Sequence, residues 1–348
     1  MKKATAETLR LATYKVRTEL GVAEHGCQHS SECPVYGTGQ GSTFSGLTSN
    51  FVSSTAIDCY NEKATPATYS NPAGTVKVTI GIAGFVNDCI GQTNKIDTVN
   101  TVLQQAQENA QVWTDLLSAT GGALEVSKCS CHVIQYKFTP QGAPSIVPCF
   151  PPENVRLRVW DPNDKTSHDL QLLAAYQSHK TLGHYKEPAG HQKEQLRQSK
   201  NKSEEVTAFL WTCPLSRSEA WTFYYACYLT SVSYPLACSS MTRSELDSIQ
   251  WKAMSIITSR CGFNRNTKKE ILYGPLELGG ASFRPLWVQQ GVGQVTMFLQ
   301  HWRKDTQAGK LSRVALTWFQ TQTGVLFPIF ANPSRPIPQL ESKWCASL

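Results

Sequence analysis

Apolar and polar residues alternate in the stretch "VKVTIGIAGF", which covers residues 76–85. Apolar side chains occupy every second position there: Val76, Val78, Ile80 and Ile82. This period of two predicts a β-strand with one buried face, because successive side chains of a strand point to opposite faces. Asn87 and Asp88 follow, and both residue types favour turns. The pattern predicts a β-hairpin that carries these two polar residues at its tip.

Helical spacing of apolar residues marks other segments. A helix is expected over the first twenty residues, ended by Gly21, and a second helix is expected from Ser42, whose hydroxyl suits an N-cap. The clearest helical pattern repeats at steps of three and four, and Gly121-Gly122 supplies its stop. Its apolar positions are Val99, Leu103, Ala106, Ala110, Trp113 and Leu117.

After this helix the pattern of the sequence predicts three successive kinds of structure. Residues 123–138, "ALEVSKCSCHVIQYKF", are expected to be extended, with Lys128 near the start. The stretch from Pro140 to about Asp169 is rich in proline, which predicts an irregular insertion or linker. From about residue 190 onward the pattern predicts a mainly helical unit.

Two capping-box signatures support the helical interpretation of the C-terminal half. They are Ser216-x-x-Glu219 and Thr242-x-x-Glu245. The helix that follows the second box is expected to bury one face, formed by Leu246, Ile249, Ala253 and Ile256. The last thirty residues show no period and are expected to be irregular.

Composition narrows the classes of function. The chain has 348 residues and a formal net charge of +7, which is compatible with a polyanionic partner. No run approaches the roughly 18 apolar residues of a membrane span, and no apolar segment follows the basic N-terminus. We therefore expect an intracellular protein without a membrane partner, in the nucleus or the cytoplasm.

Cysteine spacing and nucleophile motifs exclude two common chemistries. Twelve cysteines include no C-x-x-C pair, so a zinc site of the usual spacing is not expected. Reduced and mostly buried thiols are expected instead. No G-x-S-x-G sequence is present, which argues against a hydrolase of that type.

Three features could carry chemistry, and each has a purely structural alternative. Asn87-Asp88 could hold a divalent cation, or could simply form a turn. The glycines of "GTGQGS", residues 37–42, could bind an anion before a helix, or could form a flexible loop. Basic stretches at 190–202 and 260–269, with nearby aromatics, could contact nucleic acid, or could be solvated helix faces beside a core. Those aromatics are Trp221, Tyr224 and Tyr225.

Taken in order, several segments resemble the reverse transcriptases of non-LTR retrotransposon-type elements, from about residue 10 to about residue 300. "VYGTGQGS", "GFVNDC" and "GGALEVSKC" resemble three successive palm motifs. "HKTLGHYKEPAG" resembles the Leu-Gly hairpin that grips the primer. "LDSIQWKAMSIITSRCG" and "YGPLELGGASFRPL" resemble the thumb and the segment that follows it.

The resemblance implies a set of functional residues and ligands. The nucleotide and the template would be bound by Gly39, Gln40, Gly41 and Lys128. Asn87 and Asp88 would stand at the catalytic position, with Asp88 beside Mg²⁺, and Leu182 and Gly183 would form the primer grip. The partners would be an RNA template and a DNA primer, joined by two-metal phosphoryl transfer; protein partners are not indicated.

Two departures from the family pattern bear on activity. Asn87 stands where the family has its leading Asp, and an amide oxygen lacks the charge of a carboxylate. No Asp on an upstream strand matches the first palm motif, and the fingers have no counterpart. The expected function is that of a degenerate reverse-transcriptase relative, inactive as this chain. The alternatives are a nucleic-acid-binding remnant without catalysis, or an active polymerase if the product is longer.

The resemblance also implies a domain plan with an α+β fold. Residues 1–140 would be the C-terminal half of a polymerase palm, an antiparallel sheet with helices, and 141–180 a proline-rich linker. Residues 181–300 would hold the primer grip and a mainly helical thumb-like unit, and 301–348 an irregular C-terminal segment.

Overall fold

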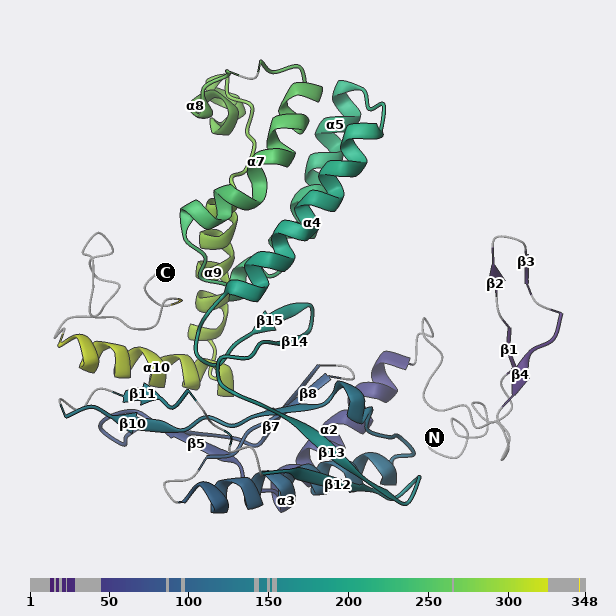
Figure 1. Ribbon diagram of the computed structural model, residues 1–348, viewed down its shortest axis with the longest axis vertical. Coiled ribbons are helices and arrows are strands. Elements are labelled where there is room, and N and C mark those ends of the chain that lie inside the picture. The colour runs from purple at the N-terminus through teal and green to yellow at the C-terminus, as the bar shows by residue number, and fades with distance from the viewer. Residues whose placement is uncertain are drawn as a thin grey trace. The chain divides into compact units, whose positions relative to one another are not determined.

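The computed structural model describes residues 13–15, 17–18, 21–22, 24–28, 45–85, 88–94, 98–140, 144–148, 151, 155–264, 266–324 and 344. The fold is mixed, with helices and small antiparallel sheets, as the α+β expectation requires (Figure 1). The chain forms two compact units, each made of several segments. The first comprises 1–67, 80–129 and 156–171, and the second 68–79, 130–155 and 172–348.

Short strands replace the predicted N-terminal helix. β1 (Thr13–Tyr14) pairs with β4 (Cys27–Gln28), and β2 (Arg17–Thr18) pairs with β3 (Gly21–Val22), both antiparallel. The helical prediction is therefore wrong for the described part of this segment. β-Branched and aromatic residues are frequent here and favour extended backbone.

Besides the four short strands β1 to β4, the described part of the first unit contains two helices and two further hairpins. Its helices are α2 (Ser45–Lys63) and α3 (Val99–Ala119), and a 3₁₀ turn, η1 (Val126–Lys128), follows them. One hairpin joins β7 (Ile82–Phe85) to β8 (Asp88–Gly91). The other joins β12 (Leu157–Asp161) to β13 (Thr166–Leu173), whose last two residues belong to the second unit. The predictions of helix over Val99–Ala119 and of a hairpin around "GFVNDC" are confirmed.

The alternating stretch 76–85 forms two strands instead of one. β6 (Lys77–Ile80) pairs with β5 (Ala67–Ser70), whereas β7 pairs with β8. The chain bends between them at Gly81, where a side chain would lie 2.5 Å from Oδ1 of Asn61 in α2. Alternation of burial is present in β6, as predicted, but close packing against the helix ends the strand at the glycine.

Polar side chains of α3 complete the backbone hydrogen bonding of the first unit. Asn109 is buried and bonds both the N–H and the carbonyl of Thr65, at 2.9 and 2.8 Å. Gln111 bonds both backbone groups of Trp160 in β12, at 2.8 and 2.9 Å. The amide of Gln111 therefore bonds the edge of β12 as a neighbouring strand would, and β12 lies along α3 (Figure 1).

The prediction that Pro140–Asp169 is irregular is wrong. β11 (Pro144–Ile146) pairs with β10 (Tyr136–Phe138), and β12 pairs with β13 in the same region. In β12 the buried residues alternate with exposed ones, and Arg158 forms a cross-strand ion pair with Asp169 at 2.7 Å. Alternation over five residues is a strand signal, which the surrounding prolines obscured in the sequence.

The second unit is mainly helical after residue 190, as predicted. Strands β9 (Ser130–His132), β14 (His179–Thr181) and β15 (His184–Lys186) precede its helices. The long helices are α4 (Lys193–Thr212), α7 (Arg243–Arg260), α9 (Leu286–Trp302) and α10 (Gln307–Thr323). The short ones are α5 (Arg217–Phe223), η2 (Tyr224–Leu229), α6 (Thr230–Ser233), η3 (Leu236–Cys238), α8 (Lys269–Tyr273) and η4 (Leu276–Leu278).

Both predicted capping boxes are present and complete. Ser216 and Thr242 accept the N–H of Glu219 and Glu245, and each glutamate bonds back to the N-cap residue. On α7 the buried residues include Leu246, Ile249 and Ala253, as predicted, and Ile257. Ile256 is only half-buried, because the face rotates by one position toward the helix end.

The expected irregular C-terminal segment contains a helix. Thr306 caps the start of α10 by accepting the N–H of Gly309 at 3.2 Å, and Gly324 ends it in the left-handed conformation. Val314 is its buried apolar residue. A cap, a buried face and a terminal glycine are sufficient for a helix, so the prediction for 301–348 is wrong over Gln307–Thr323.

Trp221, Tyr224 and Tyr225 pack in the core of the second unit. Tyr224 is 1% exposed and packs edge-on to Phe283 at 4.9 Å, and Trp221 packs on the same ring at 4.9 Å. The hydroxyl of Tyr224 also bonds the backbone N–H and carbonyl of Arg284, and Tyr225 donates to the carbonyl of Ser282. The alternative that these aromatics belong to a core is confirmed.

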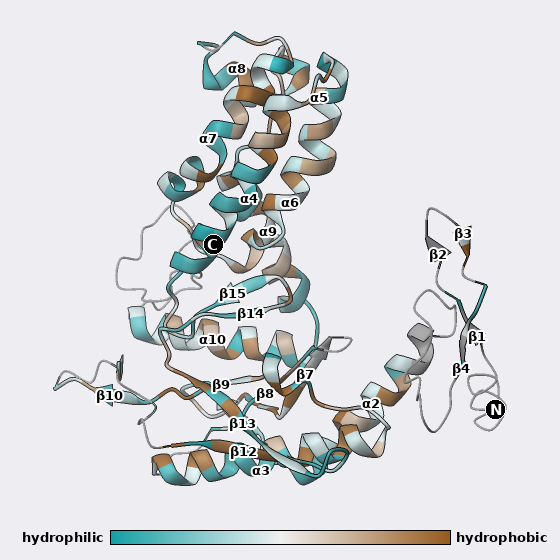
Figure 2. Ribbon diagram, turned by 45° about the vertical axis from the view of Figure 1, so that its right-hand side comes forward, coloured by the Kyte–Doolittle hydropathy of each residue, from teal (hydrophilic) through white to brown (hydrophobic). Residues whose placement is uncertain are grey.

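A buried serine fixes how α4 and α7 pack. Ser203 is 1% exposed, and its hydroxyl donates to the carbonyl of Ile249 at 2.7 Å and lies 3.2 Å from the hydroxyl of Tyr228. Further along, Lys252 of α7 contacts Glu204 of α4, and Arg260 donates to the carbonyl of Trp211. The partners stand 46 to 49 residues apart in each pair, so the two helices run in the same direction. Figure 2 shows the polar first turns of α4 and the apolar residues along α7.

We predict that Ser203→Val lowers the free energy of unfolding by about 2 kcal/mol, because a branched side chain overfills the contact and the hydroxyl bonds are lost. Urea denaturation measures the change as a lower midpoint at an unchanged slope. Ser255→Val, at an exposed position of α7, is the matched control and should cost no more than about 0.5 kcal/mol. Equal losses in the two variants would contradict the role given to Ser203.

Candidate functional site

The hairpin β7–β8 carries the acid that the sequence singled out. Asp88 is the first residue of β8, pairs with Phe85 and is exposed to solvent. It therefore lies in the strand and not in the turn itself. Asn87, which the resemblance gives the leading catalytic position, lies outside the described residues, as do Gly39, Gln40 and Gly41. Lys128, implied to contact the nucleotide, is exposed at the end of the 3₁₀ turn η1 and not within a strand.

Close packing explains the glycine that precedes this acid. A side chain at Gly84 would lie 3.2 Å from Sγ of Cys89 and 3.4 Å from the side chain of Ile57 in α2. A glycine within a strand commonly marks a place where another backbone or a ligand approaches closely. The approaching groups are a helix residue and the neighbouring strand, so this glycine serves packing.

The predicted Leu-Gly hairpin is present as a two-residue turn. β14 and β15 are antiparallel, and Leu182 and Gly183 connect them with φ values of 50° and 77°. Two successive positive φ angles match the twist of a tight hairpin. Tyr234 holds the turn on the helical unit, because its hydroxyl donates to the carbonyl of Leu182 at 2.8 Å and its ring lies against Gly183.

A buried histidine anchors the same hairpin from below the turn. His184 is 6% exposed, and its Nε2 lies 3.3 Å from the hydroxyl of Ser239, which is fully buried. The N–H of Tyr185 donates to Gln195 of α4 at 2.9 Å. Burial, and secondarily the charge of Lys186, lower the pKa of His184 to about 4. Its Nδ1 finds no hydrogen-bond partner within the described part of the chain, so the imidazole is held neutral.

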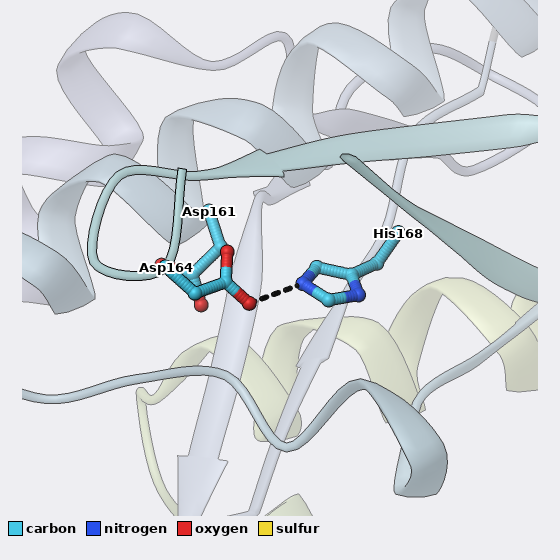
Figure 3. Close-up of side chains that lie close together, drawn as sticks. All are labelled: Asp161, Asp164 and His168. Atoms are coloured by element: carbon cyan, nitrogen blue, oxygen red, sulfur yellow. Dashed lines mark hydrogen bonds and ion pairs between the residues drawn. The ribbon is translucent and has the colours of Figure 1, made fainter. Parts of the chain in front are cut away.

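A second polar cluster surrounds the turn between β12 and β13, with Asp161 at the end of β12, Asp164 in the turn and His168 on β13. Each of three side chains offers one possible ligand atom, and these three atoms lie within 4.8 Å of one another (Figure 3). The side chains are those of Asp161, Asp164 and His168. Asp161 is buried, His168 is half-buried and Asp164 is exposed. Two carboxylates and an imidazole at this spacing could hold a metal ion. Asp88 belongs to no such group of three among the residues that the structure describes.

Hydrogen bonds within the turn already occupy these groups. Nε2 of His168 lies 2.8 Å from Oδ2 of Asp164, and Thr166 donates its N–H and its hydroxyl to Oδ1 of Asp164. The bond from Thr166, with a smaller contribution from His168, lowers the pKa of the Asp164 carboxyl. Asp161 accepts the N–H of Asn163 at 2.8 Å. Sequence inspection missed the cluster because it took this region for a linker; the polar spacing Asp161-x-x-Asp164-x-x-x-His168 was the available signal.

The described cysteines differ in part from expectation. Eight of them are free thiols, as expected for a reduced protein, but each is half-buried or exposed instead of buried.

Titration of His184 predicts a pH dependence of stability. The pKa is about 6.5 in the unfolded chain and about 4 in the folded one, so the unfolded state binds the proton first as the pH falls. The contribution of neutral His184 is therefore complete above about pH 6.5 and is lost progressively down to about pH 4, by about 3 kcal/mol in total.

Urea unfolding of the native protein and of His184→Gln across this range measures the effect. Other groups titrate equally in both proteins, so the difference between the two curves isolates His184. A difference that is constant with pH would show that the imidazole protonates freely in the folded state.

Comparison with protein-family models, with curated proteins and with solved structures gives no match for this chain. Within the described ranges, no helix combines the length and the apolar character that crossing a bilayer demands.

Proposed function

We propose that this chain is related to the reverse transcriptases of non-LTR retrotransposon-type elements and binds nucleic acid without polymerising it. In this proposal the first unit holds a remnant of the palm, and the second holds a primer-grip hairpin and a thumb-like helical part. RNA template and DNA primer, or a nucleic acid of similar shape, are the partners.

The order of the elements is the observation that carries the proposal. Helix α2 follows the "GTGQGS" motif, the hairpin β7–β8 presents Asp88, and helix α3 leads to Lys128. The tight hairpin β14–β15 then places Leu182 and Gly183 directly before the helical unit. The hairpin that carries Asp88 and the Leu182-Gly183 turn agree with the element types that the resemblance implies, whereas Lys128 lies on a 3₁₀ turn. The formal charge of +7 suits a polyanion.

The described residues do not fit the Mg²⁺ that polymerisation needs. Magnesium requires several oxygen ligands, commonly from two carboxylates. Asp88 is exposed, belongs to no group of three metal-ligating side chains in the described part of the chain, and follows Asn87 in sequence. We therefore assign no catalytic step to this chain and limit the proposal to binding.

We predict that the protein binds an RNA–DNA hybrid with a dissociation constant that rises steeply with salt, because counterions are released from the phosphates. Fluorescence anisotropy between about 50 and about 200 mM salt should give a linear decrease of log K with log salt. Primer extension with Mg²⁺ should be absent in the same preparation. An affinity that does not change with salt, or no binding at low salt, would contradict the proposal.

A further inference from the structure

A continuous groove runs between α4 and α7 on the surface of the second unit. Two adjoining hollows of about 290 and 430 Å³ form it, and both are lined by Glu204 and Lys252. Lys200 and Trp251 line the first hollow, and Trp211 lines the second. Because the two helices run in the same direction, the groove follows α4 for three turns, roughly 16 Å at 1.5 Å per residue.

Two tryptophans expose most of their rings along this groove. Trp251 is 61% exposed and Trp211 is 73% exposed. Tryptophan is strongly buried on average in folded proteins, so two exposed indoles on neighbouring helices are an informative observation. An exposed indole offers a flat π surface that stacks on other flat rings.

Positive charge accompanies the tryptophans. The ammonium of Lys252 lies 5.8 Å from the ring centre of Trp251 and 2.7 Å from Glu204. Arg260 lies in the last turn of α7 and bonds the backbone of Trp211. Lys200 and Lys252 against Glu204 give the lining of the two hollows a net charge of +1 at neutral pH. Arg260 adds a further cation beside Trp211.

The ion pair between Lys252 and Glu204 can readily give way to another partner for Lys252. Lys252 and Glu204 both keep about half of their side-chain surface in water, 49% and 56%. An exposed pair of this kind contributes little to stability, at most about 1 kcal/mol. A phosphate can therefore replace the carboxylate of Glu204 as the partner of Lys252.

We propose that this groove binds single-stranded nucleic acid, with bases stacked on Trp251 and Trp211 and phosphates on Lys200, Lys252 and Arg260. The inference rests on the proposed function for the class of partner and adds the site and the strand state. Stacking on an indole requires an unpaired base, which a duplex does not offer. Aromatic platforms interleaved with cations are the general physical device for binding single strands.

The test uses the full chain and a labelled deoxythymidine oligonucleotide of about 12 nucleotides. We expect Trp251→Ala and Trp211→Ala each to weaken binding about tenfold, and the double variant about a hundredfold, since base stacking contributes about 1–3 kcal/mol per base. Trp287→Ala is the matched control, because Trp287 is also exposed, at 42%, but lies on α9 outside the groove. It should leave binding unchanged.

A double variant tests the contribution of the positive charges and leaves Trp211 and Trp251 in place. Three phosphate contacts predict a log–log salt slope of about −2 for a single strand. Lys200→Gln with Arg260→Gln should reduce it to about −0.7, the value for one remaining contact. An unchanged slope would place the phosphates elsewhere and overturn the site.

The possible outcomes separate this inference from the proposed function. Binding of an RNA–DNA hybrid without binding of the single strand would overturn the inference and leave the proposed function standing. Binding of neither would overturn both. Single-strand binding that survives the double tryptophan variant would place the site elsewhere. Sedimentation that shows a dimer lost in the double variant would make a second copy of the chain the occupant.

Discussion

The packing of α4 against α7 in the second unit depends on the hydrogen bond from the Ser203 hydroxyl to the carbonyl of Ile249. A small side chain at this point lets α4 and α7 approach closely, and the hydroxyl fixes the register between them. From that register follow the meeting of Glu204 with Lys252 and of Trp211 with Arg260. A larger residue would separate the helices and widen the groove, so local packing and the proposed binding surface depend on one contact.

The first unit is stabilised by a different use of polar groups. Its sheets are small, and short strands leave many backbone groups at edges. The amide of Gln111 on α3 bonds both backbone groups of Trp160 at the edge of β12, and the amide of Asn109 does the same for Thr65 in the segment that follows α2. A helix therefore supplies what a further strand would supply in a larger sheet, and it keeps β12 in place beside the hairpin turn that carries Asp161, Asp164 and His168.

The sequence predicted the elements whose signals are local and strong. The capping residues Ser216 and Thr242 and the helix from Val99 each depend on residues close by in sequence, and all of them are present. The hairpin at Leu182-Gly183, which the family resemblance implies, is also present. Two failures arose where tertiary packing decides. Gly81 ends a strand because α2 lies against it, and β12 forms within a proline-rich region because α3 bonds its edge.

The candidate sites also fall into those that the sequence indicates and those that only the folded structure brings together. Asp88 and the Leu182-Gly183 turn were visible in the sequence because each belongs to a short motif. The buried His184, the turn cluster around Asp164 and the groove of Trp211 and Trp251 were not, because each depends on contacts between residues that the sequence does not pair. His184 meets Ser239 across 55 positions, and Trp211 meets Arg260 across 49.

The most direct test of the account is photocrosslinking of the full chain to a single-stranded RNA that carries 4-thiouridine, followed by mass spectrometry of the peptides. Binding in the groove predicts adducts in peptides of α4 and α7, concentrated around Trp211 and Trp251. Adducts confined to other segments, or none at low salt, would contradict the claim that this helical unit binds nucleic acid.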